Sequence, residues 1–361
     1  MQKVKSIVIT GGGTGGHVYP ALALIQTIQE KYPDIKIHFV GATSGIEKDA
    51  CEKAGIEYDG ISCMKVRRKI SVENLLVIPT IIKGIMQASR LLNKYNPDLV
   101  IGMGGYVTAP VMIAAILKRK KCVLHEQNSI PGLTNRWLAK RVDRIILTYP
   151  SAHTALSNLK TFPAGIPLRR EAFANNYPVD YEQFGLKPGI FTILVFGGSG
   201  GAKRLNEIAV ETFRTLEDNP NIQGILLTGS RDYEYILSMN PPGNLRCMEK
   251  LDEMGKAYRI ADLVVARGGA VTIAEITANK LPSILVPFPY ATGDHQRSNI
   301  IPLYEKGGCR MELEENLTSL KLADMITELK DNPSELKEII QAAGDWGRPD
   351  ANENILGVLW E

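Results

Sequence analysis

Two segments of this 361-residue chain repeat one pattern: an apolar run, a glycine-rich turn, and then apolar residues at helical spacing. In the first segment the apolar run 6–10 meets the glycines of 11–16, and in the second the run 191–196 meets those of 197–201. A strand that leads through glycines into a helix is the opening unit of a doubly wound parallel sheet. The duplication therefore predicts two domains of the same α/β type.

Further short apolar runs alternate with helical stretches, at 37–40, 99–102, 122–124, 145–147, 224–227, 263–265 and 284–286. Strands that alternate with helices form parallel sheets covered on both faces. Two prolines and a glycine interrupt the pattern at 162–167. We predict two Rossmann-like doubly wound domains facing across a cleft. The first would comprise residues 1–164 and a C-terminal helix at 345–361, and the second residues 165–344.

Composition excludes several classes of protein. Apolar residues make up 44% of the chain and charged residues 22%, which is typical of a globular enzyme. The five cysteines are odd in number and form no Cys-x-x-Cys pair, so we expect neither a disulfide framework nor a zinc site. The uncharged stretch 99–117 contains three glycines and a proline, which favours a strand, a loop and a buried helix over a membrane span. The N-terminal residues show no secretion signal, and we expect a water-soluble chain.

The glycine turns are candidate phosphate sites, because a helix start offers backbone N–H groups and a positive dipole end. Gly11, Gly13 and Gly16 match the dinucleotide pattern G-x-G-x-x-G. A nicotinamide cofactor would also need an acidic residue at the end of the second strand, and 38–42 contains none, which disfavours an oxidoreductase. Glycines that serve only tight turns and close helix packing are the alternative.

Polar residues follow several other predicted strands. His17 stands at a helix start, where the dipole favours the neutral imidazole that a general base requires, although a capping role is the alternative. Tyr106 and the cluster 125–128 follow strands of the same half. In the second half Glu275 lies one turn inside a helix that follows a glycine turn. A carboxylate there suits a ribose diol, and a solvated surface carboxylate is the alternative.

These motifs together resemble the MurG family of bacterial glycosyltransferases, and they span nearly the whole chain in the family's order. The resemblance rests on the glycine turn and His17, on 20–23, on 102–106, on 125–128, on 197–202 and on 267–275. It implies a GT-B fold and an inverting transfer of N-acetylglucosamine from UDP-N-acetylglucosamine to the 4-hydroxyl of lipid I, which gives lipid II. No Asp-x-Asp pair is present to hold a divalent ion, so we expect no metal and no cofactor.

The resemblance also implies roles for individual residues. His17 is the expected base, with Glu126 as competitor, and Tyr106, His125 and Asn128 are expected to bind the acceptor. The expected donor-binding residues are Thr14, Gly15, Gly16, Asn128, Arg169, Ser199, Leu251, Met254, Thr272, Glu275 and Gln296.

A lipid acceptor requires contact with a membrane. The predicted contact residues, basic first and then mostly apolar, are Lys65, Arg67, Arg68, Lys69, Ile78, Ile82, Lys83 and Ile85. A buried core stripe beside solvated charges is the alternative. The net charge of +3 divides unevenly: residues 1–164 carry 22 basic and 11 acidic side chains, and residues 165–361 carry 20 and 28. A basic first half suits an anionic bilayer.

The expected partners are therefore UDP-N-acetylglucosamine, lipid I and an anionic phospholipid surface at the cytoplasmic face of the bacterial plasma membrane. Other cell-wall and division proteins are further candidates. No aromatic platform accompanies the basic clusters, so we expect no nucleic-acid binding. The rival functions are another GT-B enzyme, either a glycolipid transferase or a UDP-N-acetylglucosamine epimerase, and a noncatalytic membrane adaptor. The acceptor-side residues 106–128 argue against both enzymes, and polar clusters in both halves argue against the adaptor.

Overall fold

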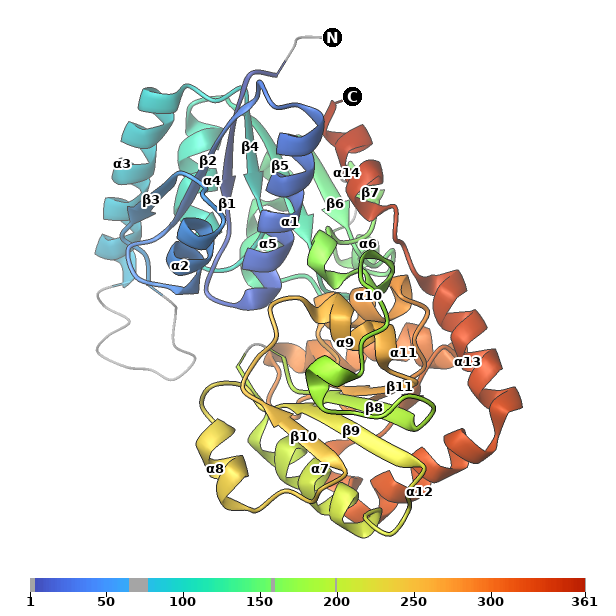
Figure 1. The fold of residues 1–361 in the computed structure, drawn as a ribbon. Coiled ribbons are helices and arrows are strands. Elements are labelled where there is room, and N and C mark those ends of the chain that lie inside the picture. The colour runs from blue at the N-terminus through green and yellow to red at the C-terminus, as the bar shows by residue number, and fades with distance from the viewer. Residues whose placement is uncertain (1–3, 65–76, 157–159, 199, 361) are drawn as a thin grey trace. The chain divides into compact units, whose positions relative to one another are not determined.

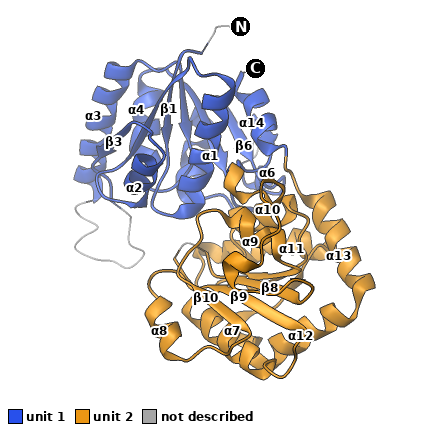
Figure 2. Cartoon of the chain, viewed as in Figure 1, with its two compact units in different colours: residues 1–169, 350–361 blue, residues 170–349 orange. Residues whose placement is uncertain are grey.

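The computed structural model describes residues 4–64, 77–156, 160–198 and 200–360. The chain divides into two compact units, one of residues 1–169 and 350–361 and the other of residues 170–349 (Figure 2). Our sequence-based junctions stood after residues 164 and 344. Each unit is built on one parallel sheet with helices on both faces (Figure 1), so the prediction of two doubly wound α/β domains is confirmed.

The first unit contains a seven-stranded parallel sheet in the order β3-β2-β1-β4-β5-β6-β7. Its strands are β1 (Ser6–Thr10), β2 (Lys36–Ala42), β3 (Tyr58–Ile61), β4 (Leu99–Gly102), β5 (Lys121–Glu126), β6 (Arg144–Leu147) and β7 (Thr161–Pro163). Its helices are α1 (Gly15–Lys31), α2 (Ile46–Lys53), α3 (Val77–Tyr95), α4 (Thr108–Leu117), α5 (Leu133–Leu138), α6 (Ala152–Ala155) and α14 (Ala351–Trp360).

Successive residues of the central strand β1 enter different cores, as the two-residue period of a strand requires. Ile7 and Ile9 pack with α1 and α14, and Val8 packs with α3 and α4 on the opposite face. Helix α14 belongs to the first unit, and Lys31 of α1 forms an ion pair with Glu353 of α14.

The second unit repeats the plan with a six-stranded parallel sheet in the order β10-β9-β8-β11-β12-β13. Its strands are β8 (Phe191–Phe196), β9 (Ile222–Leu227), β10 (Leu245–Met248), β11 (Leu263–Ala266), β12 (Ser283–Leu285) and β13 (Arg310–Met311). Its helices are α7 (Lys203–Thr215), α8 (Tyr233–Ser238), α9 (Met254–Ile260), α10 (Ala270–Ala278), α11 (His295–Glu305), α12 (Ser319–Asp331) and α13 (Pro333–Trp346). Apolar residues of α7 and α12 cover one face of the sheet, and those of α9, α10 and α11 cover the other.

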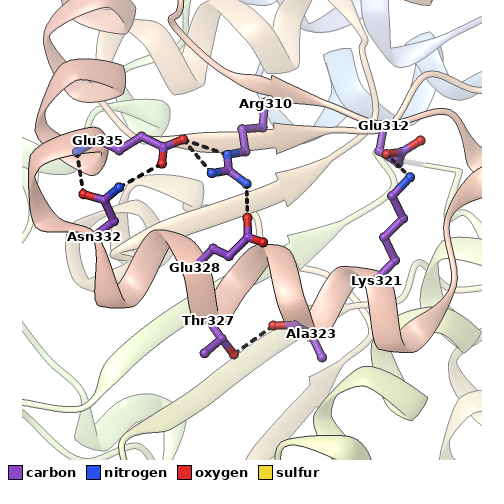
Figure 3. A network of polar contacts seen from close by, with 8 residues as sticks. All are labelled: Arg310, Glu312, Lys321, Ala323, Thr327, Glu328, Asn332 and Glu335. Carbon is purple, nitrogen blue, oxygen red and sulfur yellow. Dashed lines mark hydrogen bonds and ion pairs between the residues drawn. The ribbon is translucent and has the colours of Figure 1, made fainter.

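A polar network ties the edge strand β13 to the helices that follow it (Figure 3). The Arg310 guanidinium donates to Glu328 of α12 at 2.7 Å and to Glu335 of α13 at 2.6 Å. Asn332, between these helices, caps α13 by accepting from the Glu335 N–H. One arginine thus fixes the positions of two helices of the second unit.

The order of the strands decides where each unit can bind a ligand. It reverses direction between β1 and β4 in the first sheet and between β8 and β11 in the second. In open parallel sheets the loops at the carboxyl ends of the strands diverge at this switch point and leave room for a ligand. Each of the repeated glycine turns follows a strand at such a point.

Candidate active site

The loops after β1 and β4 interlock at the switch point of the first sheet. A Cβ on Gly13 would lie 2.6 Å from the Tyr106 ring, and a Cβ on Gly104 would lie 2.9 Å from the His17 ring. Both glycines have positive φ, of 84° and 87°, which other residues rarely adopt. Each loop therefore supports the candidate side chain carried by the other.

His17 is held at the start of α1. Its Nδ1 lies 2.9 Å from the Thr14 hydroxyl, and its backbone N–H donates to the Thr14 carbonyl at 3.1 Å. The helix N-terminus disfavours a positive charge at this position. The imidazole is thus fixed in orientation by Thr14 and Gly104, at the carboxyl edge of the sheet.

His125, at the end of β5, is almost fully buried, and its Nε2 hydrogen-bonds the Gly165 carbonyl at 2.9 Å. Its pKa is lowered to about 4, mainly by burial and to a smaller extent by the neighbouring His17, against the opposing effect of the Gly165 bond. His125 is therefore neutral at physiological pH. Its Nδ1 has no hydrogen-bonding partner among the described residues.

Glu126 organises the loop that follows β5. Its Oε1 accepts from the Asn128 N–H at 3.0 Å, and its Oε2 accepts from the Gly132 N–H at 2.9 Å and from the Asn135 amide at 2.8 Å. Burial raises the pKa of this carboxyl, and the hydrogen bonds that it accepts oppose the rise. Both oxygens thus accept hydrogen bonds within the loop around Asn128. Because they are already used in this way, His17 is the better candidate for a base than Glu126.

Arg169 ends the first unit and stacks its guanidinium on Tyr19 of α1, 4.5 Å from the centre of the ring. Its buried Nε has no hydrogen-bonding partner among the described residues. The preceding residue, Leu168, is held through both its N–H and its carbonyl by the Asn352 amide of α14. Helix α14 thereby fixes the stretch of chain that carries Arg169.

In the second unit, Glu275 is buried on α10, with 8% of its surface exposed. The Tyr258 hydroxyl of α9 donates to its Oε2 at 2.8 Å. The alternative of a solvated surface carboxylate is therefore wrong. A buried carboxylate with a fixed orientation can accept hydrogen bonds from a pair of neighbouring hydroxyls.

The other predicted donor-binding residues of this unit lie on loops and helix starts at the same carboxyl edge of the sheet. Leu251 precedes α9 and Met254 is its first residue, and both are partly buried against the core that contains Tyr258. Thr272 lies in the first turn of α10. The Gln296 Oε1 accepts from the N–H of Phe288, a residue of the loop after β12, at 2.9 Å. Ser199 falls outside the described residues, as do Lys65, Arg67, Arg68 and Lys69.

The predicted membrane residues that the structure describes lie on α3. Ile78 and Ile82 are 68% and 52% exposed, and Lys83 is exposed beside them. Ile85 is only partly exposed and packs on the core that contains Leu92, so it belongs to the inner side of the helix. Pro79 is the third residue of α3 and is tolerated there because N–H groups of a first turn have no helical acceptor.

Within residues 4–64, 77–156, 160–198 and 200–360, no three His, Cys, Asp or Glu side chains are placed to hold a metal ion. No helix in the same part of the chain is both long and apolar enough to cross a bilayer. The five cysteines, all of them described, form no disulfide.

Sequence reasoning missed several residues that shape the site. Tyr258 carried no motif that would have pointed to Glu275. Asn135 supports Glu126 and was not singled out, although it follows the 125–128 cluster closely. Gln127 belongs to that cluster, and its amide donates to the Met103 carbonyl at 2.7 Å, which connects the loop after β5 to the loop after β4. Glu47 lies beyond the stretch 38–42 in which an acidic residue was sought, yet it is buried and accepts from the Gly13 N–H of the first glycine turn.

Comparison with known proteins agrees with this geometry. The glycosyltransferase family 28 N-terminal domain matches residues 7–147, and the C-terminal domain of that family matches residues 192–355. Relatives from Desulforamulus reducens and Halothermothrix orenii are each 37% identical over 97% and 98% of this chain, and the matches cover 96% and 98% of their own lengths. Both are named UDP-N-acetylglucosamine--N-acetylmuramyl-(pentapeptide) pyrophosphoryl-undecaprenol N-acetylglucosamine transferase.

One solved structure supports the same family, and others share the fold. MurG of Acinetobacter baumannii superposes with a TM-score of 0.76 at 26% identity over 99% of both chains. A putative UDP-N-acetylglucosamine 2-epimerase from Listeria monocytogenes reaches 0.71 at 14% identity, over 99% of this chain and 96% of its own, which is a likeness of fold alone. The chain belongs to glycosyltransferase family 28 and, within it, to the MurG family of N-acetylglucosamine transferases.

Proposed function

We propose that this chain transfers N-acetylglucosamine from UDP-N-acetylglucosamine to the 4-hydroxyl of the N-acetylmuramyl (pentapeptide) unit of lipid I, with inversion, to give lipid II. The observation that carries the proposal is the His17 imidazole, which Thr14 and Gly104 hold at the switch point of the first sheet. The names of relatives at 37% identity, which match nearly end to end, support the choice of donor and acceptor.

In the proposed step, His17 takes the proton of the attacking hydroxyl as its oxygen bonds to the anomeric carbon. The bond from that carbon to the UDP oxygen breaks on the opposite face, and UDP leaves with the electron pair. A tautomer whose Nδ1–H donates to Thr14 keeps the lone pair on Nε2, where the proton would go. The neutral, buried His125 adds no positive charge that would oppose protonation of His17.

The donor would be held by residues of the second unit. Glu275, oriented by Tyr258, would accept hydrogen bonds from both ribose hydroxyls, and Leu251 and Met254 would contact the uracil. Thr272 and Gln296 would bind near the phosphates and the sugar. The Arg169 guanidinium and backbone N–H groups of the glycine turns would stabilise the charge that develops on UDP.

Incubating the chain with labelled UDP-N-acetylglucosamine and a short-chain lipid I analogue tests this proposal. A β-1,4-linked disaccharide lipid together with one equivalent of UDP is the expected product. Epimerised sugar, or UDP released without transfer, would overturn the assignment in favour of a related GT-B activity.

The role of His17 has its own test. His17→Ala should lower kcat by about 10²–10⁴-fold, the usual contribution of a general base. His153→Ala is the matched control, because His153 is an exposed histidine of the same unit that contacts Thr161. Near-normal turnover of His17→Ala would eliminate His17 as the base and return attention to Glu126.

We further propose that α3 brings the chain to an anionic membrane. Ile78, Ile82 and Met86 follow one another at four-residue spacing and are all more than half exposed, and Lys83 and Arg90 are exposed on the same helix. Apolar side chains beside lysine and arginine suit the boundary between lipid headgroups and acyl chains. The basic residues 65–69 are expected to contribute to this contact.

Vesicle sedimentation distinguishes this surface from an ordinary exposed helix. The chain should bind vesicles that contain phosphatidylglycerol, bind neutral vesicles weakly, and lose affinity as salt rises. Replacing both Ile78 and Ile82 by Glu should abolish binding. Leu320→Glu is the control, since Leu320 is 64% exposed on α12 of the second unit. Binding that is insensitive to salt and to the α3 changes would contradict the proposal.

We place this activity at the cytoplasmic face of the bacterial plasma membrane. Five cysteines without a disulfide are typical of a reducing compartment, which supports that side. Contacts with other cell-wall and division proteins stay a prediction, as do the expected independence from metals and cofactors and the absence of nucleic-acid binding.

A further inference from the structure

The start of helix α2 exposes an apolar side chain and buries a charged one, which is the reverse of an ordinary surface helix. Ile46, its first residue, is 49% exposed, and Glu47 beside it is 0% exposed. No ion pair among the described residues includes Glu47. Burying a carboxylate without a cation costs free energy. Such a group is therefore expected where its hydrogen bonds fix the surrounding backbone.

Three glycines surround the Glu47 carboxylate and make room for it. A Cβ on Gly12 would lie 2.5 Å from Oε1, a Cβ on Gly45 would lie 2.6 Å from Oε2, and a Cβ on Gly41 would lie 2.8 Å from Cγ. These glycines come from the loop after β1, from strand β2 and from the start of α2. The fold thus builds a niche of glycines for this one side chain.

The carboxylate holds the first glycine turn from below. Its Oε2 accepts from the Gly13 N–H at 3.4 Å, and its Oε1 accepts from the Ala42 N–H at 3.1 Å. The Tyr106 ring packs against Gly13. A chain of direct contacts therefore runs from Glu47 through Gly13 to Tyr106.

The charge of Glu47 also reaches Tyr106. Burial raises the pKa of the Tyr106 hydroxyl, and Cys63 and Glu47 raise it further. This rise reinforces the protonated state that a phenol already has at neutral pH, in which it can donate a hydrogen bond.

We propose that Glu47 is a positioning residue of the acceptor half of the site, which holds the Gly12–Gly13 turn and thereby keeps the Tyr106 ring in place to present its hydroxyl to the acceptor sugar. The inference rests on the proposed function and extends it to a residue outside the motifs that define the family resemblance. Glu47 is fully buried, so its effect on the acceptor would pass through the turn.

The steady-state kinetics of Glu47→Gln test the proposal. The amide has nearly the shape of the carboxylate but can accept only one of the two hydrogen bonds. We expect the KM for a lipid I analogue to rise about tenfold, and the KM for UDP-N-acetylglucosamine to change less than twofold. Ile28→Ala, a core change at the far end of α1, controls for a general loss of stability in the same unit.

A second variant displaces the carboxylate without altering it. Gly12→Ala would place a methyl group against Glu47 Oε1 and should give the same selective loss of acceptor affinity. Combining Glu47→Gln with Tyr106→Phe tests the route of action. If Glu47 acts through Tyr106, the added effect of Glu47→Gln in that background should be at most twofold.

The outcomes separate the two proposals. Wild-type chain that transfers sugar, with both KM values of Glu47→Gln unchanged or shifted together, overturns the role of Glu47 alone. Full additivity with Tyr106→Phe overturns it as well. Wild-type chain that fails to transfer sugar to the lipid I analogue refutes the proposed function and this inference with it.

Discussion

Tyr258→Phe removes one hydroxyl from the buried pair that we assign to the nucleotide. The Tyr258 hydroxyl donates to Glu275 Oε2 at 2.8 Å, and both side chains are buried. A hydrogen bond to a charged acceptor contributes about 1.5–3 kcal/mol, and the loss here is at the lower end because the carboxylate keeps a small exposed surface. A loss of about 1.5 kcal/mol from donor binding raises the KM for UDP-N-acetylglucosamine roughly tenfold.

The assay is steady-state transfer with each substrate varied in turn, together with calorimetric titration of UDP. Tyr258→Phe should raise the donor KM and the Kd of UDP by similar factors, with the acceptor KM unchanged. Tyr181→Phe makes the same chemical change beside the same core without a contact to Glu275, and should leave both constants unchanged. If the two variants bind UDP equally well, the assignment of Glu275 to the ribose is refuted.

Two further predictions concern stability. The pKa of His125 is lowered to about 4 in the folded chain. Between pH 6.5 and 4 the unfolded chain therefore binds a proton at this residue that the folded chain does not bind. The free energy of unfolding falls by up to about 1.4 kcal/mol for each pH unit in that range. Urea unfolding at several pH values should show a steeper dependence of the free energy of unfolding on pH for wild type than for His125→Gln. Equal slopes would contradict the lowered pKa of His125. Arg310→Met should destabilise the second unit by about 1 kcal/mol, because Glu328 and Glu335 lose their shared cation (Figure 3). That difference should shrink in 0.5 M salt, and a difference independent of salt would mean that packing of the arginine stem dominates.

Local pattern was enough to predict the elements that carry the site. The apolar runs at 6–10 and 191–196 are strands β1 and β8, because a buried parallel strand is apolar on both faces and glycines end it sharply. Residues at the carboxyl ends of such strands share one edge of a sheet. His17, Tyr106 and the 125–128 cluster could therefore be grouped before the structure was known.

Burial of polar side chains could not be predicted in this way. Ile46 and Glu47 would be expected in the opposite orientation, since local hydrophobicity places isoleucine inside. The exchange follows from three glycines at positions 12, 41 and 45, which the fold gathers around one carboxylate. Likewise the sequence allowed Glu275 to be a solvated surface carboxylate, whereas in the structure it accepts a hydrogen bond from the Tyr258 hydroxyl of a neighbouring helix.

The sequence by itself thus determined the two parallel sheets, their glycine turns and, through its motifs, the enzyme family. It could do so because strand and helix periods and turn residues act within a few positions of one another. Only the tertiary structure decided which of the polar residues are neutral, charged or held in place. The environment of His125 depends on the carbonyl of Gly165, and that of Tyr106 depends on Glu47, both distant in sequence. Desolvation and hydrogen bonding act through space, so the chemistry of these groups exists only once the chain has folded.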